Sequence, residues 1–301
     1  MWDDNYLSLA IETCSDQPVS IFTSDTFLDA FAPVIDGTPL FGHAMWVVKK
    51  AFVRIAYCSP WNGFIENPNV SELISAAEEE GCWALTFTSS DLIDDPRMEE
   101  LSPVPTLIVP RGYSPSKKVR WSAKKALTFG FEVGRAPAEV AYPVFSVLWG
   151  KLRRGFPLSF YQKLESAGVG GAMVARETGK PVSALFYLTD ERGVRYMYNL
   201  ATLEEHRHTQ VTTLLVHKFL EDAINSNAPY VDLCGCTEEP LYHFKSQFTD
   251  QVMFRPRYLH IIREVLWNLV SWRSSTIYRD LSPPFIDKRN WKERIVGVPK
   301  S

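Results

Sequence analysis

The feature that most constrains the fold of this chain is a run of strand patterns followed by a helix and one more strand. Short segments rich in β-branched and aromatic residues lie at Gly171–Glu177, Val182–Thr189 and Val194–Ala201. The short turns between them predict an antiparallel meander. A helix pattern from about Gln210 to Asn225 then leads into a buried strand that begins at Tyr230. A meander that continues through a helix into further strands is typical of an α+β sheet.

The first part of the chain shows a shorter version of the same order. Its expected elements are a hairpin over residues 40–57, a helix from Asn69 to Gly81, and strands at Trp83–Thr88 and Pro103–Pro110. The polar segment 111–116 then predicts a domain boundary. We expect an amino-terminal domain at 1–116, a second domain at 117–272 that ends in a helix from Tyr258 to Trp272, and a tail at 273–301.

Composition places the chain among soluble globular proteins. Hydrophobic residues are 46% of the chain and charged residues 22%, which is the range of such proteins. No apolar run approaches the roughly 18–20 residues that cross a bilayer. The first residues are acidic and lack the basic and apolar regions of a secretory signal. We therefore expect a cytoplasmic protein without a transmembrane segment.

Five scattered cysteines argue against a disulfide framework in a chain of 301 residues. The segment Cys234-Gly235-Cys236 has the wrong spacing for a zinc site and no second pair to complete one, so no metal is expected. The sequence also lacks the motifs of serine hydrolases, P-loop NTPases and zinc proteases.

The net charge of −3 hides a strong asymmetry. Residues 1–116 contain 17 acidic and 5 basic residues, whereas residues 117–301 contain 18 acidic and 27 basic residues. One interpretation is that the second part binds an anionic partner. The other is that the acidic and basic parts dock on each other.

The stretch Val231–Phe248 carries the best candidate site. A buried strand containing Asp232 ends at a glycine turn, and a short aromatic helix with Tyr242, Phe244 and Lys245 follows. Polar groups, a turn and one cation at a strand end are typical of an active-site rim. Lys245 could stabilise a developing oxyanion or could simply face solvent. Asp232 could orient an amine or accept its proton, or it could cap a helix or pair with a base.

Further candidates lie outside this stretch. Tyr198 and Asn199 end the third meander strand and could contact an acceptor, although an aromatic residue in a strand is more often part of the core. Trp61 lies in an aromatic loop that could line an acceptor groove. A basic helix has one face made of Lys117, Arg120 and Lys124 and a neighbouring one made of Lys118 and Lys125. This helix could bind an anionic ligand or could dock on the acidic first part.

Three of these segments together resemble one protein family. They are the basic segment KKVRWSAKKALTFGFEV, the meander GGAMVARETGKPVSALFYLTDERGVRYMYNLAT and the stretch YVDLCGCTEEPLYHFKSQF. The last is similar to a family pattern in which a strand with Asp and Gly is followed by Leu-Tyr-x-Phe-Lys-x-x-Phe. The chain thereby resembles the FemAB-like branch of the GNAT acyltransferase superfamily, which includes peptidoglycan aminoacyltransferases and the BioF2-like acetyltransferases.

The resemblance implies two tandem GNAT-like domains, of which the first is degenerate and the second carries the site. It also implies that Phe244 and Lys245 lie beside the reacting carbonyl and that the basic helix contributes to anion binding. Ordinary acetyltransferases hold the pyrophosphate of coenzyme A at a glycine-rich turn, but the corresponding turn here, residues 206–212, has no glycine. This departure favours the FemAB-like branch over a plain acetyltransferase.

These expectations define a function. The chain is expected to be an N-acyltransferase that moves an acyl or aminoacyl group from an activated anionic donor to an amine on a cell-envelope or carbohydrate precursor. Acyl-CoA or aminoacyl-tRNA would serve as co-substrate, tRNA would be a partner in the second case, and no tightly bound cofactor or DNA is expected. The alternative is a catalytically inactive tandem GNAT-like protein that binds a ligand or partner.

Overall fold

The fold is described from a computed structural model, in which residues 20–50, 52–58, 63–152, 155–270, 275–280 and 286–294 are placed. The strands are β1 (Gly37–Leu40), β2 (Met45–Lys50), β3 (Val53–Cys58), β4 (Ala84–Thr88), β5 (Glu99–Pro110), β6 (Glu132–Ala136), β7 (Gly170–Glu177), β8 (Lys180–Thr189), β9 (Arg195–Thr202), β10 (Tyr230–Gly235) and β11 (Val252–Ile261). The helices are α2 (Asp25–Ile35), α3 (Val70–Glu79), α4 (Lys117–Leu127), α5 (Ala138–Leu152), α6 (Leu158–Ser166), α7 (Val211–Asn225), α8 (Glu239–Lys245), α9 (Glu264–Val270) and α10 (Ser275–Tyr278). Short 3₁₀ helices lie at η1 (Ile21–Thr23), η2 (Glu204–Thr209) and η4 (Trp291–Arg294).

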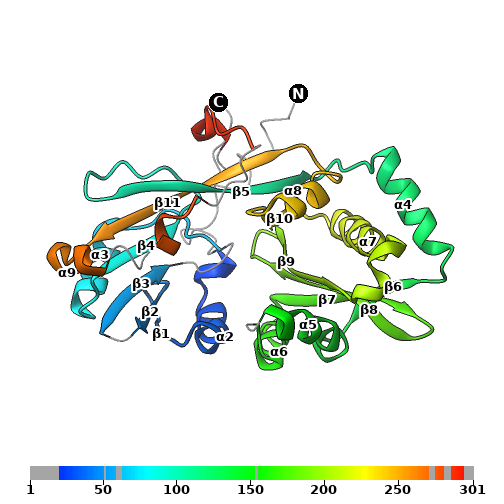
Figure 1. Ribbon diagram of the computed structural model, residues 1–301, viewed down its shortest axis with the longest axis horizontal. Coiled ribbons are helices and arrows are strands. Elements are labelled where there is room, and N and C mark those ends of the chain that lie inside the picture. The colour runs from blue at the N-terminus through cyan, green and yellow to red at the C-terminus, as the bar shows by residue number, and fades with distance from the viewer. Residues whose placement is uncertain are drawn as a thin grey trace.

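All of these strands form one mixed sheet, in the order β1-β2-β3-β4-β11-β5-β10-β9-β8-β7-β6. The meander β7-β8-β9 is antiparallel, and α7 connects β9 to the parallel strand β10. The first part repeats this plan, because β2 and β3 form a hairpin and α3 connects β3 to the parallel strand β4. The sheet is thus α+β with helices on its faces, as the sequence predicted (Figure 1).

The two parts of the chain exchange their last strands at the centre of the sheet. β5 follows β4 in sequence but pairs with β10, whereas β11 follows β10 but pairs with β4. The two exchanged strands also pair with each other. Each part therefore completes the sheet of the other, and the domain boundary predicted after residue 116 stays a prediction.

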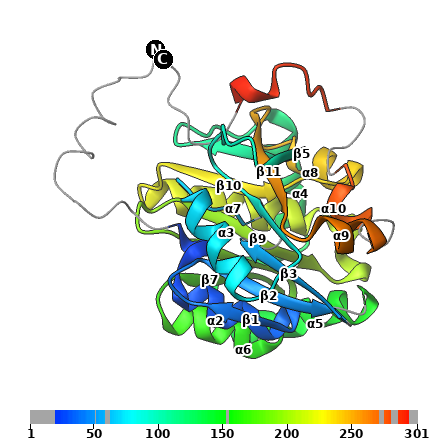
Figure 2. The ribbon, with the colours of Figure 1, turned by 90° about the vertical axis from the view of Figure 1, so that its left-hand side faces the viewer.

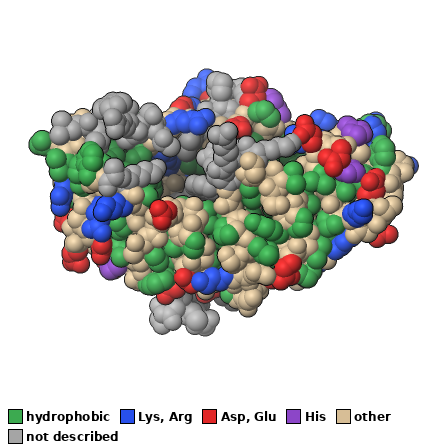
Figure 3. All heavy atoms as spheres, turned by 60° about the horizontal axis from the view of Figure 1, so that its bottom comes forward, with side chains coloured by type: hydrophobic (Ala, Val, Ile, Leu, Met, Phe, Trp, Pro, Cys, Tyr) green, Lys and Arg blue, Asp and Glu red, His purple; other side chains and the backbone are tan. Residues whose placement is uncertain are grey.

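The two faces of the second part of the sheet have different cores. The lower face in Figure 1 packs against α2, α5 and α6 through an aromatic core that includes Phe27, Phe31, Phe160 and Tyr198. Figure 2 shows the same helices together below the sheet. The opposite face packs an aliphatic core against α7, with Leu215 fully buried. Figure 3 shows that the outer surface toward α2, α5 and α6 carries scattered charges of both signs among hydrophobic side chains.

One expectation about an element is wrong. The helix predicted from Tyr258 to Trp272 begins only at Glu264, because Tyr258–Ile261 continue β11, where Tyr258 is buried between β4 and β5. Of the two interpretations of the basic helix, docking on the acidic first part is not seen among the described residues, because α4 packs on α7, at the opposite end of the molecule from β1–β3 (Figure 1).

Candidate functional site

A β-bulge interrupts the central strand β10. The pairing of β10 with β5 shifts register between Asp232 and Gly235, and Cys234 has a left-handed backbone conformation with φ of +62°. The backbone N–H of Cys234 donates to Asp232 Oδ1 at 2.6 Å, which holds the bulge in place. Bulges are frequent next to active sites because they re-aim side chains and interrupt strand pairing. The bulge in β10 is therefore the centre of the candidate site.

Asp232 is fully buried, and both of its carboxylate oxygens have partners. Oδ1 also accepts a hydrogen bond from the Thr106 hydroxyl, and Oδ2 forms an ion pair with Arg255 Nη2. The guanidinium of Arg255 lies 3.9 Å from the ring centroid of Phe64. These contacts match the interpretation in which Asp232 pairs with a base. Removing one partner of such a pair leaves a buried charge without compensation, so the pair has a strong structural role.

Lys245 is the last residue of α8 and is only 5% exposed. Its Nζ donates to the carbonyl oxygens of Leu233 at 2.6 Å, Gly235 at 2.8 Å and Cys234 at 3.4 Å. Burial lowers the pKa of this ammonium group. An ammonium group has three donors, and here each has a backbone acceptor, so Lys245 holds the bulge. Its role as the cation that stabilises an oxyanion stays a prediction.

Tyr198 and Asn199 lie on β9 and are buried in the aromatic core. Asn199 Nδ2 donates to the hydroxyl of Tyr161 at 3.1 Å. The Tyr198 ring centroid lies 5.7 Å from that of Phe156. The Tyr198 hydroxyl is buried without a hydrogen-bond partner among the described residues, and burial raises its pKa well above the ordinary value. These are the contacts of core residues, and the acceptor-binding role stays a prediction.

The remaining predicted residues lie in separate places. Tyr242 and Phe244 on α8 pack against the aliphatic core, next to Lys245. Lys117, Arg120 and Lys124 occupy exposed positions on α4, which packs on α7. Trp61 lies outside the described residues. The structure thus brings Asp232 and Lys245 together at the bulge and leaves the basic helix apart from them.

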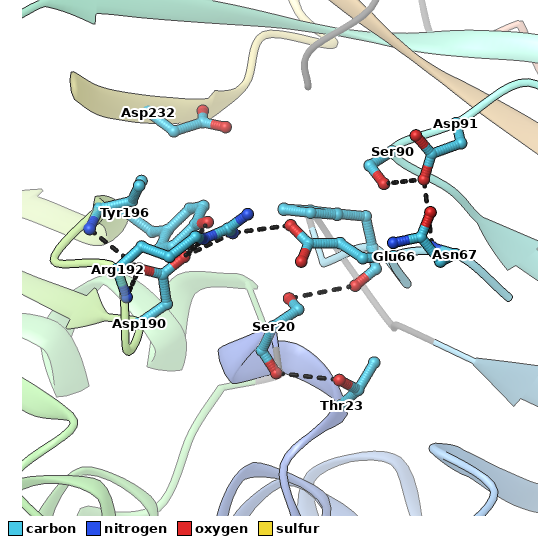
Figure 4. Close-up of polar contacts among 12 residues, drawn as sticks. Ser20, Thr23, Glu66, Asn67, Ser90, Asp91, Asp190, Arg192, Tyr196 and Asp232 are labelled. Atoms are coloured by element: carbon cyan, nitrogen blue, oxygen red, sulfur yellow. Dashed lines mark hydrogen bonds and ion pairs between the residues drawn. The ribbon is translucent and has the colours of Figure 1, made fainter. Parts of the chain in front are cut away.

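Sequence reasoning missed a cluster of carboxylates and arginine where the loop after β3 meets the turn between β8 and β9, a region that we call the seam (Figure 4). Glu66, in the loop, accepts a hydrogen bond from Arg192 Nη2 at 2.7 Å. Arg192, in the turn, also donates to Asp190 Oδ2 at 2.7 Å, and the Tyr196 hydroxyl donates to the same oxygen at 3.0 Å. The sequence offered only a weak signal, because Glu66 follows the aromatic loop expected to line an acceptor groove.

Glu66 borders a hollow of about 130 Å³ lined by residues from 42–44 and 65–73. The ionisable groups lining it are Glu66, Glu72 and His43, so its charge is acidic. Burial raises the pKa of Glu66, and the nearby guanidinium of Arg192 partly opposes that shift. The Glu66 side chain remains 17% exposed. A half-buried carboxyl group with a raised pKa beside a hollow can bind an amine and accept a proton from it.

The turn before α7 shows how the chain differs from enzymes with a glycine-rich turn. Gln210 precedes the first residue of α7 and has φ of +65°, a conformation that glycine usually adopts. Its side chain does not cap the helix, and Val211 and Thr213 in the first turn of α7 are buried. Arg207 and His208 are exposed beside them. This turn could hold an anion, although the side chain of Gln210 restricts its approach.

Three further observations concern a second hollow, metal-binding clusters and membrane-spanning helices. A second hollow, of about 310 Å³, is lined by residues that include Arg135, Glu165 and Tyr187, and it contains none of the predicted site residues. Within the described ranges, no group of three or more His, Cys, Asp or Glu side chains could hold a metal ion. No helix in the described part of the chain is long and apolar enough to span a bilayer.

Comparison with known proteins identifies the fold. No protein-family model and no curated protein sequence matches the chain. FemX has the same fold, with a TM-score of 0.64 and 12% sequence identity over 90% of this chain and 99% of FemX. L-PGS from Bacillus licheniformis is also similar, with a TM-score of 0.56 and 12% identity over 87% of this chain and 99% of that one. The α+β fold that the resemblance predicted is confirmed, because the chain shares the fold of FemX and of L-PGS.

Proposed function

We propose that this protein is an acyltransferase that moves an acyl or aminoacyl group from an activated donor to an amine, which binds at the acidic hollow beside Glu66. The fold supports the reaction class, since it extends over nearly all of FemX and of L-PGS. A structure of similar fold is the carboxy-terminal domain of a protein assigned as a lysylphosphatidylglycerol synthetase, a name that describes attachment of a lysyl group to a lipid. An acceptor on a cell-envelope or carbohydrate precursor is the finer form of the proposal.

The observation that carries the proposal is the state of Glu66. An amine is protonated in neutral water and cannot attack a carbonyl carbon until it loses that proton. Burial raises the pKa of Glu66, which makes its carboxylate a better proton acceptor than an ordinary glutamate. Arg192 holds the carboxylate from the other part of the chain at 2.7 Å, so its orientation is fixed. Glu66 therefore combines a site for a cationic amine with a base for its proton.

The proposed reaction balances without a further reactant. Glu66 first takes one proton from the bound ammonium group and releases it to water. The neutral acceptor nitrogen then forms a bond to the donor carbonyl carbon, while a second proton passes from this nitrogen to Glu66. The bond from that carbon to the thiol sulfur of coenzyme A, or to the ribose oxygen of tRNA, then breaks, and the proton returns to the leaving group. Asp232 and Lys245 act on the bulge of β10, which they hold by the hydrogen bonds described above. They are positioning residues in this scheme.

A donor and acceptor screen tests the proposal. The purified protein is incubated with acetyl-CoA, longer acyl-CoAs or aminoacyl-tRNA, each with a set of primary amines that includes amino sugars and lysine-containing peptides, and new amides are detected by mass spectrometry. We expect one donor class to give an amide product. Absence of product with every pair, together with tight binding of a ligand that stays unchanged, would contradict an enzyme.

The matched variants of this screen are Glu66→Gln and Glu79→Gln, which alter a carboxylate of the hollow and an exposed carboxylate on α3 outside it. Loss of a general base lowers turnover by roughly 10²–10⁴-fold, so we expect a fall of that size for Glu66→Gln. The Glu79→Gln variant should keep the original rate, because Glu79 does not line the hollow. Equal rates for the two variants would remove Glu66 from the mechanism.

A second candidate function is a ligand- or partner-binding protein without catalysis. The geometry at Lys245 favours it, because backbone carbonyls occupy all three donors of that ammonium group. Stabilisation of the folded protein by a donor separates the two candidates, since a ligand at 100 times its dissociation constant raises stability by about 2.7 kcal/mol. A donor that stabilises the protein and is also consumed supports the enzyme.

A further inference from the structure

The outward side of α4 and the turn after it form a surface that the proposed function does not use. We call it the α4 face and define it by its exposed residues, which are Lys117, Lys118, Arg120, Trp121, Lys124, Lys125, Leu127 and Phe129. The inward side of the helix is fixed by buried Val119, Ala123 and Ala126. The packing of α4 on α7 therefore leaves the α4 face directed outward.

The charge of the α4 face is uniformly positive. Residues 101–131 contain six basic residues and no acidic ones, and five of the six lie on the α4 face. The helix is 11 residues long, which at 1.5 Å per residue corresponds to roughly 16 Å. Cations at this density raise the local concentration of anionic partners. The charge of this face therefore favours an anionic partner.

The α4 face is also apolar, which an ordinary solvated basic helix is not. Trp121 is 61% exposed, Leu127 53% and Phe129 44%. Lys125 Nζ lies 5.3 Å from the ring centroid of Trp121, so the cations and the apolar groups share one surface. Exposed apolar groups gathered in this way mark interaction sites. The partner must therefore offer anionic groups and an apolar layer together.

We propose that the α4 face docks on the surface of a bilayer that contains anionic phospholipids. Lipid phosphates would neutralise the five cations, while Trp121, Leu127 and Phe129 would enter the apolar layer just below the headgroups. An RNA partner matches the cations and could stack on Trp121, but its phosphate surface gives Leu127 nothing to bury against. The α4 face lies at the end of the long axis (Figure 1), so docking leaves the seam free. The inference holds whether or not the protein transfers acyl groups.

Co-sedimentation of the full chain with vesicles tests the inference. The vesicles consist of phosphatidylcholine alone or with roughly one-third phosphatidylglycerol, whose negative surface attracts basic residues. We expect at least tenfold stronger partitioning into the anionic vesicles at about 0.1 M salt, and loss of most of that difference at about 1 M salt, where screening is strong. Equal partitioning into both vesicle types, or no binding to either, would overturn the inference.

Two variant sets separate the electrostatic from the apolar contribution. The first set reverses two charges, Lys124→Glu and Lys125→Glu. The second set removes the apolar side chains by Trp121→Ser, Leu127→Ser and Phe129→Ser. Each set should lower partitioning into anionic vesicles at least tenfold. Their controls are Lys49→Glu on β2 and Val265→Ser on α9, at exposed positions outside the α4 face, and these should bind like the original protein. Circular dichroism checks that each variant is folded. Binding that neither set reduces, or tight binding of tRNA with no binding to vesicles, would contradict a lipid surface.

Discussion

Two carboxylate–arginine pairs lie near the centre of this molecule, and they differ in their access to water. The side chains of Asp232 and Arg255 are 0% and 1% exposed. Glu66 and Arg192 are 17% and 35% exposed, and Glu66 borders a hollow. Both carboxylate oxygens of the first pair are satisfied inside the protein, whereas the second keeps an open side. A carboxylate whose oxygens are all hydrogen-bonded inside the protein can stabilise the fold but cannot exchange a proton with a ligand. We therefore assign a structural role to Asp232 and Arg255 and a catalytic role to Glu66.

The largest expected effect tests the architectural pair. Asp232→Asn keeps the shape of the side chain and an acceptor oxygen but removes the carboxylate charge that forms the buried ion pair with Arg255. Breaking a buried pair in this way costs about 3–5 kcal/mol, to be measured as the free energy of unfolding in urea. The exposed control Asp250→Asn should change stability by less than about 0.5 kcal/mol. Full stability with abolished turnover in Asp232→Asn would reverse the assignment.

The next effect concerns Lys245. Lys245→Met retains an unbranched side chain but removes the donors to the carbonyls of Leu233 and Gly235, and it leaves those oxygens buried. We expect a loss of about 2–3 kcal/mol in the free energy of unfolding. Turnover per folded molecule should fall only in proportion to the distortion of the bulge. A stable variant without turnover would instead support Lys245 as the oxyanion-stabilising cation, the role that the family resemblance implies.

The smallest expected effect on stability concerns the hydroxyl groups of two tyrosines on β9. The Tyr198 hydroxyl has no partner among the described residues, whereas the Tyr196 hydroxyl donates to Asp190 at 3.0 Å. Tyr198→Phe should leave stability unchanged or raise it by up to about 1 kcal/mol, while Tyr196→Phe should cost about 1–2 kcal/mol. Both changes in the free energy of unfolding are measured by thermal unfolding. If Tyr198→Phe lowers turnover at full stability, its hydroxyl contacts the substrate.

Local patterns predicted the elements of this fold well, but they did not predict how the central strands pair. The meander, α7 and β10 follow from strand propensity and turns. The exchange of β5 and β11 does not follow from local patterns, because both strands are buried for most of their length. Such strands lack the alternation of polar and apolar residues that would indicate which strand they pair with. Long-range pairing decides their positions.

The candidate site shows the same limit at the level of single side chains. The motif correctly indicated a strand that contains Asp232 and a short helix after it that contains Lys245, while the catalytic roles of both residues stay predictions. It could not indicate that Lys245 is buried against carbonyls, because lysine is almost always exposed. Glu66 was missed because a glutamate in a loop normally faces solvent, and Arg192 lies 126 residues away in sequence. Only the folded chain brings them together.

NMR titration of the protein with ¹³C-labelled glutamate carboxyl groups measures the pKa of Glu66, on which the proposed chemistry depends. Glu66→Gln assigns the resonance, and Arg192→Gln removes the guanidinium that holds the pKa down. We expect a pKa for Glu66 above the ordinary value of 4.5, and a higher one still in Arg192→Gln. A pKa at or below 4.5 in the original protein, with no rise in Arg192→Gln, would contradict it.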